Sequence, residues 1–149
     1  MRYIRFLAVA VLAALTLAVI PASASATPRD AMLAKINAVR AYKGLHPLRL
    51  SRSLSTSSGV YARYLMRRDV FGHASRIRAS RRFRTLGEIL ERHRGSRPQV
   101  SATFRAWMNS PGHRHVLLSP RFYWIGLGRT AGRFHGRRST IWVGQLGRK

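Results

Sequence analysis

Apolar residues recur at helical spacing in three parts of the chain. The first stripe predicts a helix with Asp30 as its N-cap and its end at Gly44. Its apolar members fall on one face of a helix: Met32, Leu33, Ile36 and Val39. Asn37, on the same predicted helix, is interpreted as a structural side chain that bonds a neighbouring backbone group.

A second helix is predicted from a cap at Ser51 or Ser53 to about Arg68. The residues expected on its buried face are Leu54, Val60, Tyr61, Tyr64 and Leu65. Its middle, residues 55–59, is a poor helix former because it holds four Ser or Thr residues and a glycine. Close packing of these small residues against a sheet would compensate.

The third helical stripe consists of Val100, Phe104 and Trp107. The helix should stop at Ser110, because the residue before a proline is pushed out of the α region. Ser110 can then cap a second, short helix with Pro111 at its first position. This arrangement places His113 in the first turn of that helix, on rigid backbone.

Three segments read as strands, namely 85–90, 122–129 and 139–147, and the last two are joined around Gly132 and Gly136. Alternation along the first strand puts Glu88 on the same face as Leu86 and Leu90. A carboxylate among leucines is costly to desolvate unless it is paired. Glu88 is therefore a candidate site residue, and the alternative is a plain ion pair with an arginine.

Several connecting residues are expected to point inward. The leucines near Pro47 should face the core, Phe71 should fill it, and Gly72 should turn the backbone so that His73 faces a cleft. The leucines concerned are Leu45, Leu48 and Leu50. The histidines outside this arrangement are interpreted as surface residues: His46, His93, His115 and His135.

The first 26 residues have the pattern of a secretory signal peptide. Arg2 and Arg5 precede an apolar run from Phe6 to Ile20, and the small residues 24–26 form a cleavage site. We expect cleavage after Ala26, which leaves one domain from 27 to 149 with no transmembrane segment, secreted or periplasmic and monomeric. An uncleaved N-terminal anchor is the alternative.

The charge is strongly positive and cysteine is absent. Lysine and arginine total 28 against 4 acidic residues, a formal net charge of +24. Without Arg2 and Arg5, 26 basic residues remain against 4 acidic ones, a charge of +22. Such a surface attracts anionic envelope polymers or lipids. The sequence contains no motif for specific nucleic-acid binding. Without cysteine, stability must come from the core alone.

Three blocks of the sequence resemble the CAP superfamily (cysteine-rich secretory proteins, antigen 5 and pathogenesis-related group 1), in its short bacterial form. They read F-G-H-A-S at 71–75, G-E at 87–88 and W-M-N-S-P-G-H-R at 107–114. The motif L-L-S-P-x-F with I-G-L-G follows, and N-x-x-R-x-x-x-G-L-x-P-L precedes them, so the resemblance runs from about residue 36 to 147.

The resemblance implies an α+β fold, a three-layer α-β-α sandwich with a small antiparallel sheet. It also implies a divalent-metal site, zinc above all, held by His73, Glu88 and His113, since imidazole and carboxylate are usual zinc ligands. Relatives carry a fourth ligand, an acid, where this chain has Ser110, so moderate affinity is expected. Ser75, Asn109 and Ser110 are expected to line the cleft.

The function implied is a secreted binding module for lipid or other envelope material, because some relatives bind sterols and fatty acids. Two alternatives stay open. A metal-dependent hydrolase would use a histidine as base and Ser75 or Ser110 as nucleophile, although no catalytic residue can be assigned. A basic polyanion-binding protein would use the charge alone.

Overall fold

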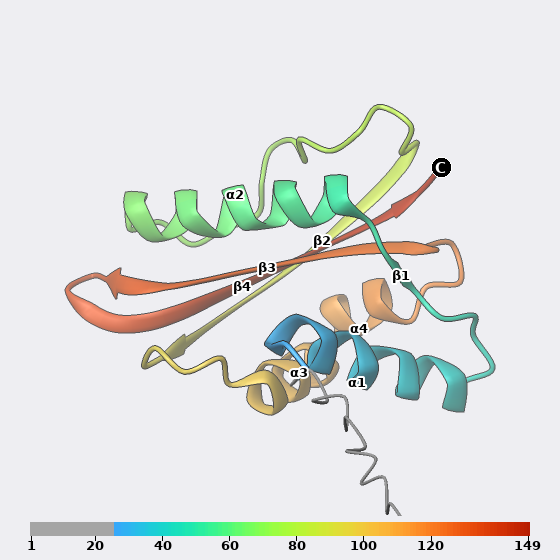
Figure 1. Ribbon diagram of the computed structural model, residues 1–149, viewed down its shortest axis with the longest axis horizontal. Helices are drawn as coiled ribbons and strands as arrows, with labels where there is room; N and C mark the ends of the chain where they lie inside the picture. Colours follow the sequence, from blue (N-terminus) through green and yellow to red (C-terminus); the bar gives the residue numbers. More distant parts are fainter. Residues whose placement is uncertain (1–25) are drawn as a thin grey trace, which may run out of the picture.

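The computed structural model describes residues 26–149 and has three layers (Figure 1). The sheet has the order β1-β3-β4-β2, with α2 on one face and α1, α3 and α4 on the other. The predicted α+β sandwich is confirmed. The elements are α1 Pro28–Tyr42, β1 Arg49–Leu50, α2 Arg52–Arg68, β2 Thr85–Arg94, α3 Val100–Asn109, α4 Pro111–Leu117, β3 Trp124–Phe134 and β4 Arg137–Arg148. The predicted signal peptide lies outside the described residues, apart from Ala26.

The sheet is mostly antiparallel. β4 pairs with β2 and β3 in antiparallel register, while the two-residue edge strand β1 pairs parallel to the start of β3. The β3–β4 turn lies at His135 and Gly136, with φ of 46° and 73°. Two successive positive φ values match the twist of a tight hairpin. The predicted connection is confirmed at Gly136 and was wrong at Gly132, which lies inside β3.

The core has two parts, one on each face of the sheet. The larger part, under α1, α3 and α4, includes Met32, Ile36, Leu117 and both Trp107 and Trp142. The smaller part lies under α2: Ala62, Leu65, Met66, Leu90, Phe134, Ile141 and Val143. Within residues 26–149, no helix is long and apolar enough to cross a membrane.

α2 lies with its backbone almost directly on β3. A Cβ added at Gly126 would lie 2.0 Å from the Leu54 carbonyl carbon, and one at Gly128 would lie 2.3 Å from the Gly59 nitrogen. The small residues of α2 therefore face the sheet, as expected; Ser58 is fully buried. The prediction that Val60 and Tyr64 are buried was wrong, since they are 49% and 44% exposed.

Several local predictions can be compared with the structure. Asn37 is structural, as predicted: its amide binds both the nitrogen and the oxygen of Leu48. Thr27, and not Asp30, is the N-cap of α1, and Asp30 completes the capping box with it. Leu48 is buried, but Leu50 is 36% exposed. Phe71, predicted to fill the core, is 46% exposed.

A buried arginine ties α1 to the far end of the chain. Arg40 is fully buried and donates to the backbone oxygens of His46, Leu117, Ser119 and Phe122 at 2.7–3.4 Å. Burial lowers the pKa of its guanidinium. Because Leu117 ends α4, the cation also lies at the negative end of that helix. Arg40 thereby fixes the helix that carries His113.

Candidate functional site

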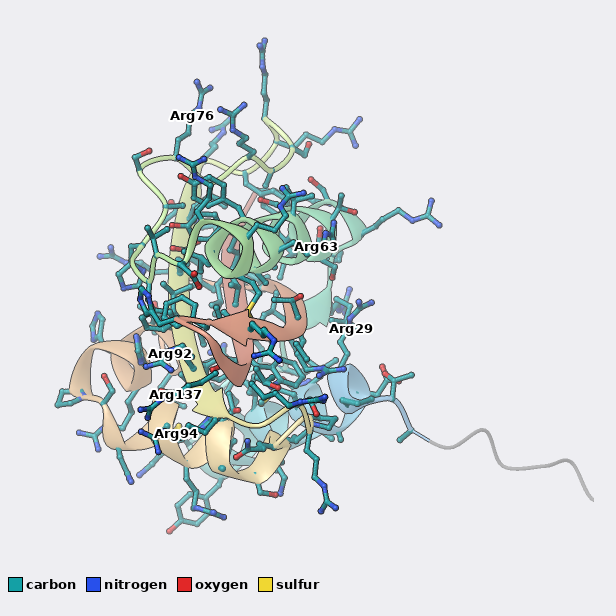
Figure 2. All side chains as sticks on the ribbon, turned by 90° about the vertical axis from the view of Figure 1, so that its left-hand side faces the viewer. Arg29, Arg63, Arg76, Arg92, Arg94 and Arg137 are labelled. Carbon is teal, nitrogen blue, oxygen red and sulfur yellow. The ribbon has the colours of Figure 1, made fainter. Side chains whose placement is uncertain are left out.

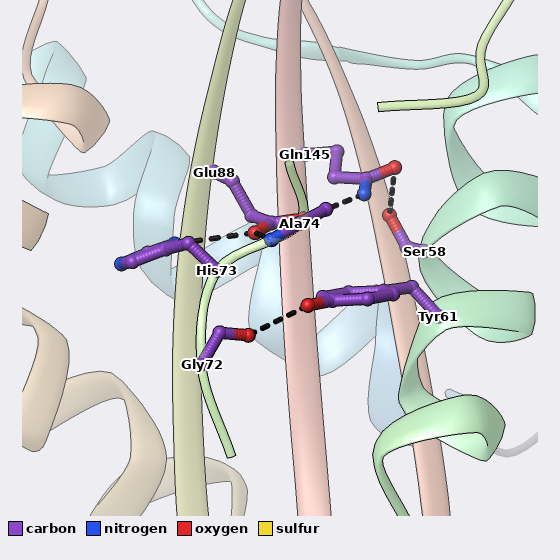
Figure 3. Close-up of polar contacts among 7 residues, drawn as sticks. All are labelled: Ser58, Tyr61, Gly72, His73, Ala74, Glu88 and Gln145. Carbon is purple, nitrogen blue, oxygen red and sulfur yellow. Dashed lines mark hydrogen bonds and ion pairs between the residues drawn. The ribbon is translucent and has the colours of Figure 1, made fainter. Parts of the chain in front are cut away.

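Glu88 is the centre of a polar network at the β2 edge of the sheet (Figure 3). Its side chain is only 6% exposed. One oxygen, Oε1, accepts the backbone N–H of Ala74 at 2.8 Å and lies 3.1 Å from Nδ1 of His73. The carboxylate is therefore paired, as its burial requires. Its partner on the facing loop is His73, which forms an ion pair with it only when the imidazole is protonated, and no arginine of residues 26–149 lies within ion-pair distance of it.

The network continues into the sheet and α2. Gln145, opposite Glu88 in the β2–β4 register, donates to Glu88 Oε2 at 2.8 Å. Ser58 Oγ lies 3.1 Å from the oxygen of Gly126 and 3.4 Å from Gln145 Oε1. Sequence reasoning missed Gln145 and Ser58. The available signal was a glutamine within the otherwise apolar run of residues 141–146, two residues after Val143.

His73 presents one ring nitrogen to solvent. Its side chain is 58% exposed. Because Glu88 accepts at Nδ1, the network places the proton there and leaves the lone pair of Nε2 free. The loop that carries His73 is held on its other side by Tyr61, whose hydroxyl donates to the oxygen of Gly72 at 2.7 Å (Figure 3). Burial and the charge of Glu88 raise the pKa of Tyr61, which keeps this donor protonated.

His113 lies next to His73, although α4 packs on the opposite face of the sheet from α2. The ring centroids are 6.2 Å apart at an interplanar angle of 67°. The Nδ1 atom of His113 is buried and has no hydrogen-bond partner within residues 26–149. Burial lowers the pKa of His113, a charge on His73 lowers it further, and Glu91 partly opposes both. The imidazole is therefore neutral at neutral pH.

The two histidine rings lie near each other, slightly farther apart than a shared tetrahedral ion requires. Zn–N bonds of about 2.0–2.1 Å, an imidazole radius of about 1.2 Å and a tetrahedral angle place two ligating rings roughly 5–5.5 Å apart, centre to centre, against 6.2 Å here. Both rings can offer a neutral nitrogen. Both Glu88 oxygens, in contrast, already accept hydrogen bonds. No three His, Asp or Glu side chains lie together as a metal-holding group in the described part of the chain. The ligand set His73, Glu88 and His113 stays a prediction.

Beside His73, a cavity of about 790 Å³ opens between α2 and the loop of residues 70–78. We call it the α2 groove. Its wall includes four exposed apolar side chains, and the loop adds Arg76 and Arg78. The apolar side chains are Val60, Tyr64, Val70 and Phe71. An exposed apolar cluster of this kind is typical of ligand-binding grooves.

The remaining predicted residues are spread more widely. Ser75 lines the α2 groove, whereas Asn109 and Ser110 are not among its lining residues. Ser110 is the N-cap of α4 by position, but its side chain makes no capping bond. Within residues 26–149, no serine hydroxyl is hydrogen-bonded to the ring of His73 or His113. The hydrolase hypothesis stays a prediction.

Two of the other histidines differ from the surface prediction. His93 has a buried Nε2 without a partner in the described residues, so it is not a surface side chain. His46 stacks on Tyr123 with ring centroids 3.9 Å apart, and its Nε2 lies 3.0 Å from the oxygen of Pro120. His115 and His135 are exposed, as predicted.

Comparison with known proteins agrees with this fold. The model of the cysteine-rich secretory protein family (CAP) matches residues 33–146. The protein YkwD of Bacillus subtilis is 30% identical over 135 residues, which cover 85% of this chain and 49% of YkwD. The chain thus spans about half the length of that relative.

Solved structures are similar in fold. An outer surface protein of Borrelia burgdorferi has a TM-score of 0.66 at 20% identity, covering 82% of this chain and 92% of the Borrelia protein. An extracellular protein with an SCP domain from Bacillus anthracis has a TM-score of 0.60 at 20% identity, covering 85% of this chain and 45% of that protein. The chain belongs to the cysteine-rich secretory protein (CAP) family.

Proposed function

We propose that this protein is a secreted binding module whose α2 groove takes up an amphiphile of the cell envelope, a molecule with an acyl chain and an anionic head group. One observation carries the proposal: a groove of about 790 Å³ exposes Val60, Tyr64, Val70 and Phe71 together. Covering apolar surface of this kind contributes about 25 cal/mol of favourable binding free energy per Å².

The rim of the groove supports an anionic head group. Arg76 and Arg78 lie on the loop that forms one wall, and His73 lies on the same loop. No acidic side chain lines the groove among the described residues. A head group with a carboxylate or phosphate would therefore meet only neutral or positive partners, and guanidinium groups bind such oxyanions in a planar, two-point geometry.

The first test uses a fluorescent long-chain fatty acid as the probe. Tyr64→Ser should weaken its binding about tenfold, because roughly 60 Å² of covered apolar surface is lost. Tyr42→Ser is the matched control, since Tyr42 is 84% exposed and lies on α1, away from the groove. Equal affinity of the two variants would contradict the proposal. The double variant Arg76→Gln with Arg78→Gln should weaken binding of the fatty acid more than binding of the corresponding long-chain alcohol.

We also propose that His73 and His113 bind a divalent transition metal such as zinc beside the groove, with Glu88 fixing the tautomer of His73. A carboxylate that accepts the second N–H of a ligating histidine is a common arrangement in metal sites. The bond from His73 Nδ1 to Glu88 supports it. The bound ion would add a positive partner for an anionic head group. With two nitrogen ligands from the protein and no acidic ligand, the affinity for zinc should be moderate.

Zinc calorimetry tests this ligand set. His73→Ala and His113→Ala should each abolish measurable zinc binding, and Glu88→Gln should weaken it about 10- to 100-fold. His115→Ala is the control, because His115 is exposed and not in the network. Binding should fall below about pH 6.5, where imidazole becomes protonated. An unchanged zinc affinity in both histidine variants would rule out this site.

A further inference from the structure

A second basic surface lies at the end of the sheet where β3 turns into β4. Six exposed arginines gather there, and we call them the hairpin-end arginines: Arg92, Arg94, Arg97, Arg133, Arg137 and Arg138. Figure 2 faces this end of the molecule and shows Arg92, Arg137 and Arg94 along the course of β2. The β2–β4 register agrees, because Arg94 lies opposite Ser139, two residues from Arg137.

The guanidinium groups of these arginines have no carboxylate partner within residues 26–149. Three of the acids make other contacts: Asp30 with Thr27, Glu88 with His73, and Glu91 with the backbone N–H of its neighbour Arg92. Asp69 lies at the same end, but its Oδ1 accepts the backbone N–H of His135 at 2.8 Å. The only ion pair among the described residues is His73–Glu88.

Two of the arginines face each other across the hairpin. Arg133 and Arg138 are partners in the β3–β4 register, so their side chains share one face. Like charges directly opposite each other destabilise a strand pair. A hollow of about 240 Å³ lies beside them, lined also by Ser96, Ala131 and Gly132. Arg133 is held by a bond from Nη1 to the oxygen of Gly136 at 3.0 Å. The two guanidinium groups beside this hollow can offer several N–H donors to an oxyanion.

The opposite face of the sheet continues the surface. Arg92 and Arg94 lie on β2 and point to the α2 side, with Cα atoms about 6.6 Å apart as alternate residues of a strand. The Arg92 guanidinium lies 4.7 Å from the ring centre of Phe134, which orients it. Arg97 lies on the loop that follows β2, and its backbone oxygen accepts a hydrogen bond from Thr140 Oγ1 at 3.1 Å. Six arginines spread over both faces of this end match a chain of anions better than a single ion.

We propose that the hairpin-end arginines bind a linear polymer that carries a phosphate in each repeating unit and no nucleobases. Guanidinium groups favour phosphate through two-point hydrogen bonds. Binding of single-stranded nucleic acid relies on exposed aromatic rings that stack on bases. On the hairpin, Phe134 is only 4% exposed, and the imidazole of His135 is the one exposed ring of its turn. This surface is separate in composition from the α2 groove and does not depend on its function.

The test measures binding of long-chain inorganic polyphosphate to three forms of the protein. The hairpin variant is Arg94→Gln, Arg133→Gln and Arg138→Gln. The control variant, with the same net charge, is Arg49→Gln, Arg52→Gln and Arg121→Gln, at exposed positions on the opposite end of the sheet. Thermal unfolding checks that each variant is folded, and polyphosphate should raise the unfolding temperature of the parent and control proteins more than that of the hairpin variant.

The hairpin variant should bind polyphosphate at least tenfold more weakly at low salt. The slope of log affinity against log salt should fall in magnitude by about 2–3, or about one for each phosphate that the variant no longer neutralises. The control variant should change less than threefold. Equal weakening in the two variants would overturn the proposal, because net charge alone would then explain binding. Tighter binding of single-stranded DNA than of polyphosphate of equal charge would overturn the assigned polymer class.

Discussion

At the scale of single residues, the chain uses one of its few acids and one of its many arginines in buried networks. Glu88 accepts three hydrogen bonds, and Arg40 donates to four backbone oxygens without any carboxylate. A buried charge of this kind is tolerated only when its hydrogen-bonding groups are satisfied. Both residues hold the elements that carry the two histidines of the site.

Arg40→Met should destabilise the protein by roughly 3 kcal/mol or more. The methionine fills part of the volume but leaves buried carbonyl oxygens unpaired, at about 1–3 kcal/mol each when no water replaces the bond. Arg40→Lys should recover only part of the loss, because an ammonium group cannot reproduce the planar fork. Urea unfolding with an unchanged m-value measures this. Arg49→Met, at an exposed position, should stay within about 0.5 kcal/mol of the parent.

The stability of the metal-free protein should fall as the pH drops through about 6.5. The pKa of His113 is lowered in the folded state, so between its folded and unfolded values the unfolded chain binds more protons. The neutral imidazole makes its full contribution to stability above the unfolded-state pKa of about 6.5. This contribution is lost as the pH falls from there towards the lower pKa of the folded state. Urea unfolding in a chelator at pH 5 to 8 measures it. His113→Gln should flatten the profile, whereas His115→Gln should not.

At the scale of elements, the close approach of α2 to β3 decides the architecture. β3 alternates Ile125 and Leu127, which face the larger core, with Gly126 and Gly128, which face α2. The groove then exists because α2 has two apolar stripes. One, with Leu54 and Leu65, is buried on the sheet, and the other faces the loop of residues 70–78.

Gly126→Ala or Gly128→Ala should therefore disrupt the sandwich. The added methyl group would lie 2.0–2.3 Å from backbone atoms of α2, which cannot move aside as a side chain could. We expect a loss of about 3 kcal/mol or failure to fold, at the upper end of overpacking costs. Gly112→Ala is the control. Nothing lies within 4 Å of its added Cβ in α4, so stability should be unchanged or rise by up to about 1 kcal/mol. Denaturant unfolding distinguishes the two outcomes.

Periodicity predicted the elements but not the use of every apolar residue. The stripes that place Trp107 and Ile36 in the core were read correctly, because their helices have one apolar face. Val60 and Tyr64 follow the same spacing but line the groove, and a sequence does not distinguish a stripe that packs from one that binds. The pairing of His73 with Glu88 came from family resemblance; Gln145 required the strand register.

At the scale of the whole molecule, acidic and basic side chains serve different functions in different places. Asp30 and Glu88 serve the cap of α1 and the β2 edge network, and the hairpin end is mainly basic, with Asp69 and Glu91 as its acids. The two proposed binding surfaces thus differ in chemistry. The α2 groove combines apolar surface with a rim of arginines, and the hairpin end presents arginines alone. A single protein could hold an amphiphile while attached to an anionic polymer.

The contacts of Arg40 have a consequence for the order of folding. Its bonds to Leu117, Ser119 and Phe122 span 77 to 82 residues, and β1 pairs with a segment 75 residues later. Contacts between such distant residues form slowly, because long loops must close before the contacts stabilise anything. While the chain is synthesised from its N-terminus, α1 lacks these partners until residue 122 is made. The domain can therefore complete its fold only when nearly all of the chain is present.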